Sequence, residues 1–207
     1  MKDGVCFHSP KSKILDVIVE ESFDPSVGYQ NDCEGYVIDL SVIVRSQAAI
    51  AVSQNCKTFF DFSEIVINYI EHLGQFATRL DIVADHYYPF SIKSPTRQDR
   101  GTGGSRLLFR EDTPFPSDFS TDFLKNSENK EDLNMFLASA ARHKSWEKLV
   151  YVTHGEGVKE CTTGGDIRMY EDDGLTLEEA DNRMICHISH MIDSGILVSL
   201  YELQTRM

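Results

Sequence analysis

Residues 36–44 read YVIDLSVIV and form the most hydrophobic stretch of the chain, with one acid, Asp39, inside it. A β-branched run with so little polar alternation is typical of a strand covered on both faces, as in a parallel sheet. Residues 59–73 follow with apolar side chains at helical spacing, and Gly74 marks the end of that helix. LDIVAD at 80–85 predicts a second buried strand. Strand, helix and strand in this order predict a right-handed βαβ unit.

The rest of the chain continues the alternation of helices and strands. The pattern predicts a helix over 129–143, a strand over 149–154, a hairpin over 158–170, a helix that begins at Thr176 and stops at Gly195, and a strand over 196–200. Short steps between strands and helices favour a three-layer α/β fold, in which helices flank a mostly parallel central sheet and the hairpin is a small insertion. We expect residues 1–34 to be an N-terminal arm or accessory element and residues 35–207 to form the α/β domain.

The composition limits the class of protein. The chain has 207 residues, 41% of them apolar and 26% charged, which excludes collagen-like, low-complexity and wholly disordered chains. No stretch has the roughly 20 apolar residues that span a bilayer, and the first residues lack the apolar core of a signal peptide. The five cysteines form no CxxC pair, which favours reduced thiols. We therefore expect an intracellular protein, nuclear or cytoplasmic, that is not bound to a membrane.

The charge of the chain is unevenly distributed. A net charge of −13 argues at first against a nucleic-acid partner, because phosphate binding requires a basic surface. Residues 91–110, however, hold five cationic residues against one acid. The segment follows the second predicted strand directly, so cations lie where a phosphate backbone can approach.

Asp39 and Asp85 occupy equivalent places on the two predicted strands. Asp39 interrupts the first strand and Asp85 closes the second. The carboxyl ends of parallel strands line one edge of a sheet, where ligands bind in α/β folds. Each acid is also suited to an ordinary role at a strand end, because aspartate commonly caps the next helix. The sequence leaves both roles open.

A third acidic group, Glu178, Glu179 and Asp181, opens the last predicted helix. Thr176 and Glu179 have the spacing of a capping box, and acids in a first helical turn also suit the helix dipole. Carboxylates from three segments that converge without thiols or imidazoles would instead suit a hard cation, Mg²⁺ or Mn²⁺. Such an ion activates water and stabilises a phosphate under attack.

Four stretches in this order, YVIDLSVIV, LDIVADHY, SIKSPTRQDRG and EEADNRMI, resemble the PIN-like nucleases, most closely the flap-endonuclease branch. The resemblance covers residues 35–195 and extends to uncharacterised animal proteins associated with mobile elements. It implies two sets of functional residues. The implied catalytic ligands of Mg²⁺ or Mn²⁺ are Asp39, Asp85, Glu179 and Asp181. The implied contacts to the backbone of DNA or RNA are Lys93, Arg97 and Arg100.

The sequence departs from this family at its end. The family follows the acidic helix with a strand that ends in paired acids, whereas ILVSLYELQTRM contains only Glu202. We therefore expect a domain that is incomplete or degenerate at its C-terminus. Three functions stay open: a Mg²⁺- or Mn²⁺-dependent nuclease that hydrolyses phosphodiesters, a non-catalytic module that binds nucleic acid or protein, and a decayed mobile-element fragment.

Two histidines and a tryptophan complete the candidate residues. His187 and His190 lie three residues apart on the last predicted helix. A zinc site would need further ligands such as His154 or Cys161, so a polar helix face is the favoured interpretation. Trp146 is expected in the core or at its boundary.

Overall fold

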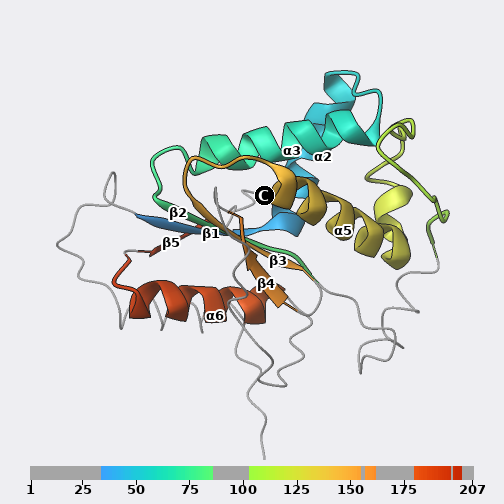
Figure 1. Ribbon diagram of the computed structural model, residues 1–207. Coiled ribbons are helices and arrows are strands. Elements are labelled where there is room, and N and C mark those ends of the chain that lie inside the picture. The colour runs from blue at the N-terminus through green and yellow to red at the C-terminus, as the bar shows by residue number, and fades with distance from the viewer. Residues whose placement is uncertain (1–33, 86–102, 155–156, 162–179, 197, 202–207) are drawn as a thin grey trace, which may run out of the picture. The chain divides into compact units, whose positions relative to one another are not determined.

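The computed structural model describes residues 34–85, 103–154, 157–161, 180–196 and 198–201, all of which belong to one unit of the chain, residues 33–207. The centre of this unit is a five-stranded sheet with the order β4-β3-β2-β1-β5 (Figure 1). The strands are β1 (Gly35–Asp39), β2 (Arg79–Val83), β3 (Leu149–His154), β4 (Gly157–Glu160) and β5 (Val198–Tyr201). The pairs β1–β2, β1–β5 and β2–β3 are parallel, whereas β4 runs antiparallel to β3.

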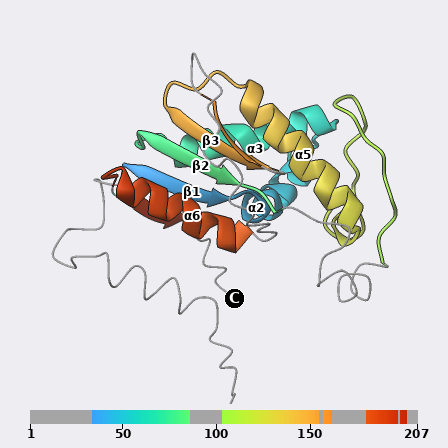
Figure 2. The ribbon, with the colours of Figure 1, turned by 60° about the horizontal axis from the view of Figure 1, so that its bottom comes forward.

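Helices cover both faces of the sheet. The helices are α2 (Leu40–Ser53), α3 (Phe59–Leu73), α5 (Ser127–His143), α6 (Ala180–Asp193) and the short 3-10 helix η1 (Phe123–Lys125). Figures 1 and 2 show α2, α3 and α5 on one face and α6 on the other. This arrangement confirms the expected α/β fold with a largely parallel sheet between helical layers. None of the helices in the described ranges is long and apolar enough to cross a membrane.

The predicted strand over 36–44 is wrong from residue 40 onward, where α2 begins. The side chain of Asp39 accepts a hydrogen bond from the backbone N–H of Ser41 at 2.7 Å and so caps the new helix. The apolar run then continues at helical spacing, and α2 buries Leu40, Ile43, Val44, Ala48 and Ala51. A short apolar run alone does not distinguish a strand from a buried helix.

Other local predictions agree with the structure more closely. The helix over 59–73 and the strand over 149–154 have the expected bounds, while the strand expected at 80–85 is β2, which ends at Val83. The βαβ unit contains two helices, α2 and α3, between β1 and β2. Of the hairpin expected over 158–170, the described part is β4, which pairs back onto β3; residues 162–170 lie outside the described ranges.

The two faces of the sheet differ in polarity. Facing α2, α3 and α5 are apolar side chains, among them Ile38, Leu80, Ile82, Val150 and Val152. This core extends into an aromatic group in which Phe59 stacks on Phe109 at 4.0 Å between ring centroids and Phe119 stacks on Phe123 at 4.9 Å. Trp146 is buried in the same core, as expected, and its indole N–H donates to the carbonyl of Ala141 at 2.8 Å.

The face that α6 covers is partly polar. At Gly35 an added Cβ would lie 2.7 Å from Sδ of Met191, so a larger residue on β1 would require the side chain of Met191 on α6 to move. The next positions on this face of the strands include Val37 on β1 and Asp81 on β2, which are paired in the sheet. A charged residue therefore lies in the centre of the layer between sheet and helix.

Candidate functional site

Asp39 lies where β1 ends and α2 begins, so its carboxylate is at the edge of the sheet formed by the carboxyl ends of the parallel strands. We call this edge, marked by Asp39 and Asp85, the carboxyl edge. The hydrogen bond from the N–H of Ser41 to Oδ1 of Asp39 confirms the capping role considered for this acid. The residue as a whole is half-buried.

Asp85 lies at the same edge, two residues after the end of β2. Its Oδ2 accepts a hydrogen bond from the hydroxyl of Ser41 at 3.1 Å, and its Oδ1 accepts one from the backbone N–H of Ala180 at 2.8 Å. Its backbone carbonyl accepts from the side-chain amide of Asn134 at 3.1 Å. Ser41 thus bridges the two carboxylates, and Asp85 connects the ends of β1 and β2 with the start of α6 and with α5.

The remaining predicted site residues are placed only in part. Asp181 follows Ala180 in the first turn of α6, so its backbone is next to the group that Asp85 binds, although the structure describes nothing of its side chain. Glu179 and the three predicted nucleic-acid contacts, Lys93, Arg97 and Arg100, lie outside the described ranges. Among the residues that are described, no three acidic, histidine or cysteine side chains form a group that could hold a metal.

The carboxylates of Asp39 and Asp85 have the chemistry that a hard cation requires. Both carboxylates offer oxygen atoms as ligands. Oxygen donors of this kind suit Mg²⁺ or Mn²⁺, and a Mg²⁺ site commonly uses one or two carboxylates with water in the other positions. Asp39 and Asp85 would hold such an ion, with the segment around Asp181 beside them.

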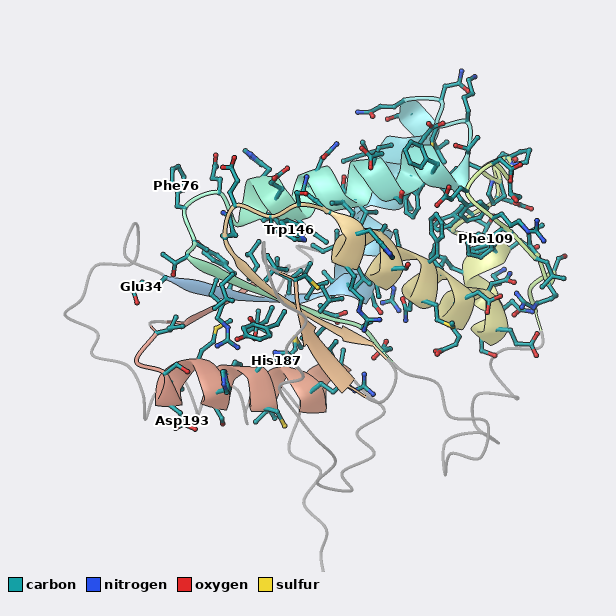
Figure 3. The ribbon with its side chains drawn as sticks, viewed as in Figure 1. Glu34, Phe76, Phe109, Trp146, His187 and Asp193 are labelled. Atoms are coloured by element: carbon teal, nitrogen blue, oxygen red, sulfur yellow. The ribbon has the colours of Figure 1, made fainter. Side chains whose placement is uncertain are left out.

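A buried network of charged and polar side chains lies between the sheet and α6. Arg79 and Asp81, both on β2, form a two-fold contact in which Nε donates to Oδ1 at 2.8 Å and Nη2 donates to Oδ2 at 2.7 Å. His187 of α6 approaches the same carboxylate, with Nδ1 2.6 Å from Oδ2 of Asp81. Figure 3 shows His187 between α6 and the sheet. Asp81 is fully buried, and Arg79 and His187 are each 1% exposed.

His187 continues the network to β3. Because a carboxylate only accepts hydrogen bonds, Nδ1 of His187 carries the proton, and Nε2 is left to pair with the hydroxyl of Thr153 at 2.5 Å. Thr153 is itself buried. The order Asp81, His187, Thr153 has the residue types of a nucleophilic triad, but the side chains of all three are buried. The geometry of the network serves to hold α6 on the sheet.

His190 closes the network at its other end. Nδ1 of His190 lies 2.8 Å from Nη1 of Arg79, and Arg79 lies over the ring of Tyr151 at 4.3 Å. Arginine has no acceptor, so Nδ1 of His190 accepts and the ring is neutral in this contact. Burial, followed by the nearby Arg79 guanidinium, lowers the pKa of His190 from its usual value. His187 and His190 therefore form the polar helix face that the sequence favoured, and this face lies against the sheet.

Sequence reasoning missed Arg79 and Asp81 because it treated 80–85 as an apolar strand that ends in an acid. A signal was present, since residues i and i+2 of a strand point to the same face and these two have opposite charge. Their partner His187 lies 106 residues away from Asp81, so no local pattern indicated it.

Comparisons of the chain with family models, curated proteins and solved structures give no match.

Proposed function

We propose that this chain is a PIN-like domain that binds Mg²⁺ or Mn²⁺ at the carboxyl edge and hydrolyses phosphodiester bonds of nucleic acid. One observation carries the proposal: the hydrogen-bonded connection from Asp39 through Ser41 to Asp85, and from Asp85 to Ala180. It supports a shared site because the segments that carry Asp39, Asp85 and Asp181 meet at one edge of the sheet.

The residues at this edge have separable roles in the proposal. Asp39 and Asp85 hold the cation, and Ser41 orients both carboxylates through its N–H and its hydroxyl. A bound divalent cation supplies activation of water and neutralises charge on the phosphate. Lys93 and Arg97, with Arg100, stay predicted contacts to the nucleic-acid backbone.

A second candidate function is a non-catalytic binding module of the same fold. The observation that favours it is that both carboxylates already serve the fold: Asp39 caps α2, and Asp85 accepts the N–H of Ala180 at the start of α6. Acids retained for capping need no metal, and a domain of this kind could keep its fold after losing its chemistry.

The test is a cleavage assay on labelled single-stranded DNA, flap DNA and RNA with Mn²⁺ or Mg²⁺. We expect metal-dependent cleavage by the wild-type chain and its loss in Asp39→Asn and Asp85→Asn. These variants isolate the charge, because asparagine caps a helix as well as aspartate does. Thr58→Ala is the matched control, because it removes a helix cap, that of α3, without changing any proposed metal ligand. This variant should keep the activity.

Metal binding is measured separately from cleavage. A ligand that binds only the folded state stabilises it by about 2.7 kcal/mol at a concentration of 100 times its dissociation constant, so Mn²⁺ should raise the unfolding midpoint. Asp39→Asn and Asp85→Asn should remove this increase. Cleavage that both substitutions leave unchanged would overturn the metal site. If no substrate is cleaved and Mn²⁺ has no effect on unfolding, the binding module is the better description.

A further inference from the structure

We infer that the pocket between α2 and α5 binds a phosphodiester group of a nucleic-acid strand through Arg45 and Lys130, next to the carboxyl edge. This inference rests on the proposed function and extends it, because these two cations lie outside the basic segment predicted from the sequence. The pocket has a volume of about 50 Å³. A water molecule needs about 10–15 Å³ in such a cavity, so a group larger than one water fits.

Helical spacing directs both cations into this one pocket. Ser41 and Arg45 are four residues apart on α2, and Lys130 and Asn134 are four apart on α5; residues at this spacing share a helix face. All four line the pocket. Arg45 is exposed and Lys130 half-buried, so both charged groups are within reach of a ligand that approaches from solvent.

The pocket borders directly on Asp85. Two of its lining residues, Ser41 and Asn134, donate hydrogen bonds to Asp85, one to the carboxylate and one to the backbone carbonyl. A strand whose one phosphate lies at the carboxyl edge would therefore bring a neighbouring phosphate to Arg45 and Lys130. Arginine in particular matches phosphate geometry with paired N–H donors.

The pocket brings two cations together although the chain is acidic overall. Among the described residues that line it, Arg45 and Lys130 are basic and none is acidic, while the carboxylate of Asp85 lies at its border. The acids Glu128 and Asp132 of α5 lie on another face of the helix, where both pair with Arg106 at 2.9 and 2.6 Å. The apolar lining residues Val44 and Leu133 offer contact surface for a sugar or base beside the phosphate.

The test is fluorescence anisotropy of the full chain with labelled single-stranded DNA and RNA of one sequence, in EDTA so that no metal-dependent cleavage occurs. Charge-assisted contacts of this kind contribute enough that Arg45→Ala and Lys130→Ala should each weaken binding by about ten-fold. Each should also lower the slope of log affinity against log salt by about 0.7. The matched control is Lys57→Ala, which removes an exposed cation outside both the pocket and the basic segment 91–110 and should change affinity less than two-fold.

The outcomes separate this inference from the proposed function. Equal affinities for wild type, Arg45→Ala and Lys130→Ala would overturn the pocket while leaving metal-dependent cleavage intact, and so would an equal loss in the control variant. Selective loss in the pocket variants without any cleavage by the wild-type chain would uphold the pocket and overturn the nuclease. A wild-type chain that binds neither strand in EDTA would overturn the pocket, and the cleavage assay with Mn²⁺ or Mg²⁺ would still decide the nuclease. Thermal unfolding of each variant, with Lys130→Gln as a second substitution of the half-buried lysine, excludes misfolding as the cause of a loss.

Discussion

Replacing Asp81 by asparagine is expected to lower the free energy of unfolding by about 3–5 kcal/mol, the range for removing one partner of a buried ion pair. The substitution keeps the size of the side chain and creates no cavity. It removes the charge that balances Arg79 and turns one oxygen acceptor into an N–H donor. Asp81 accepts two hydrogen bonds from Arg79 and one from His187, with none of its surface exposed. The asparagine side chain accepts only through its carbonyl oxygen, and its NH2 group donates. At least one N–H of Arg79 or His187 would therefore face this NH2 group instead of an acceptor.

The magnitude is large compared with the stability of the whole domain. The free energy of unfolding of native proteins is about 5–15 kcal/mol. In a chain of 150–250 residues, each kcal/mol lost from it lowers the unfolding temperature by about 2–4 °C. The variant should therefore melt roughly 6–20 °C below the wild type. Urea unfolding followed by circular dichroism measures the free energy, and hydrogen exchange shows whether protection is lost first in α6, which His187 joins to Asp81.

Asp112→Asn is the control for this prediction, because Asp112 is exposed and the same chemical change there should stay within about 0.5 kcal/mol. A change below about 1 kcal/mol for Asp81→Asn would refute the reasoning. It would mean that the Arg79 guanidinium keeps enough support from His190 and Tyr151 to lose Asp81 without penalty.

Three further predictions follow from single contacts. His190 has a folded-state pKa below its unfolded value of 6.5, so its contribution to stability is present above pH 6.5 and is lost as the pH falls toward the folded pKa. The urea midpoint of the wild type should therefore decrease between pH 7.5 and 5.5, and this decrease should be smaller in His190→Gln. An equal decrease in the variant would contradict the role of His190. Thr58→Ala removes half of the capping box of α3 and should cost about 0.5–2 kcal/mol in urea unfolding, with Thr121→Ala, exposed and outside a helix, as a neutral comparison. Gly74→Ala adds a Cβ that would overlap the side chain of Leu80, and it should lower the free energy of unfolding by about 1–3 kcal/mol. A stabilised variant would show that the side chain of Leu80 can move away without loss.

Elements with strong local signals were predictable from the sequence. The helix over 59–73 has regular apolar spacing and a start signal, since Thr58 and Asp61 form a capping box. The region of α2 was not predictable in this way, because its apolar run satisfies the criteria for a strand as well as those for a buried helix. The start of α2 depends on the carboxylate of Asp39, which is a local effect. The burial of α2 depends on its packing against α3 and the sheet, which is a tertiary effect.

The candidate site divides along the same line. The placement of Asp39 and Asp85 at one edge followed from the sequence, because both acids end strands of one parallel sheet. The bridge through Ser41 did not follow, since the hydroxyl and the carboxylate are 44 residues apart. The same holds for Asp81 and His187, which are 106 residues apart.

By itself, the sequence determined the alternation of helices and strands, the α/β class and the two acids at the carboxyl edge. These features depend on side-chain periodicity and on strand ends, which are local. Only the tertiary structure decided that α6 lies on the opposite face from the other helices, that Arg79, Asp81 and His187 are buried together, and that Arg45 and Lys130 share a pocket. The physical reason is that a hydrogen bond or an ion pair depends on distance in space. These partners are separated by dozens of residues in the chain, and the local sequence pattern around one partner does not indicate the other.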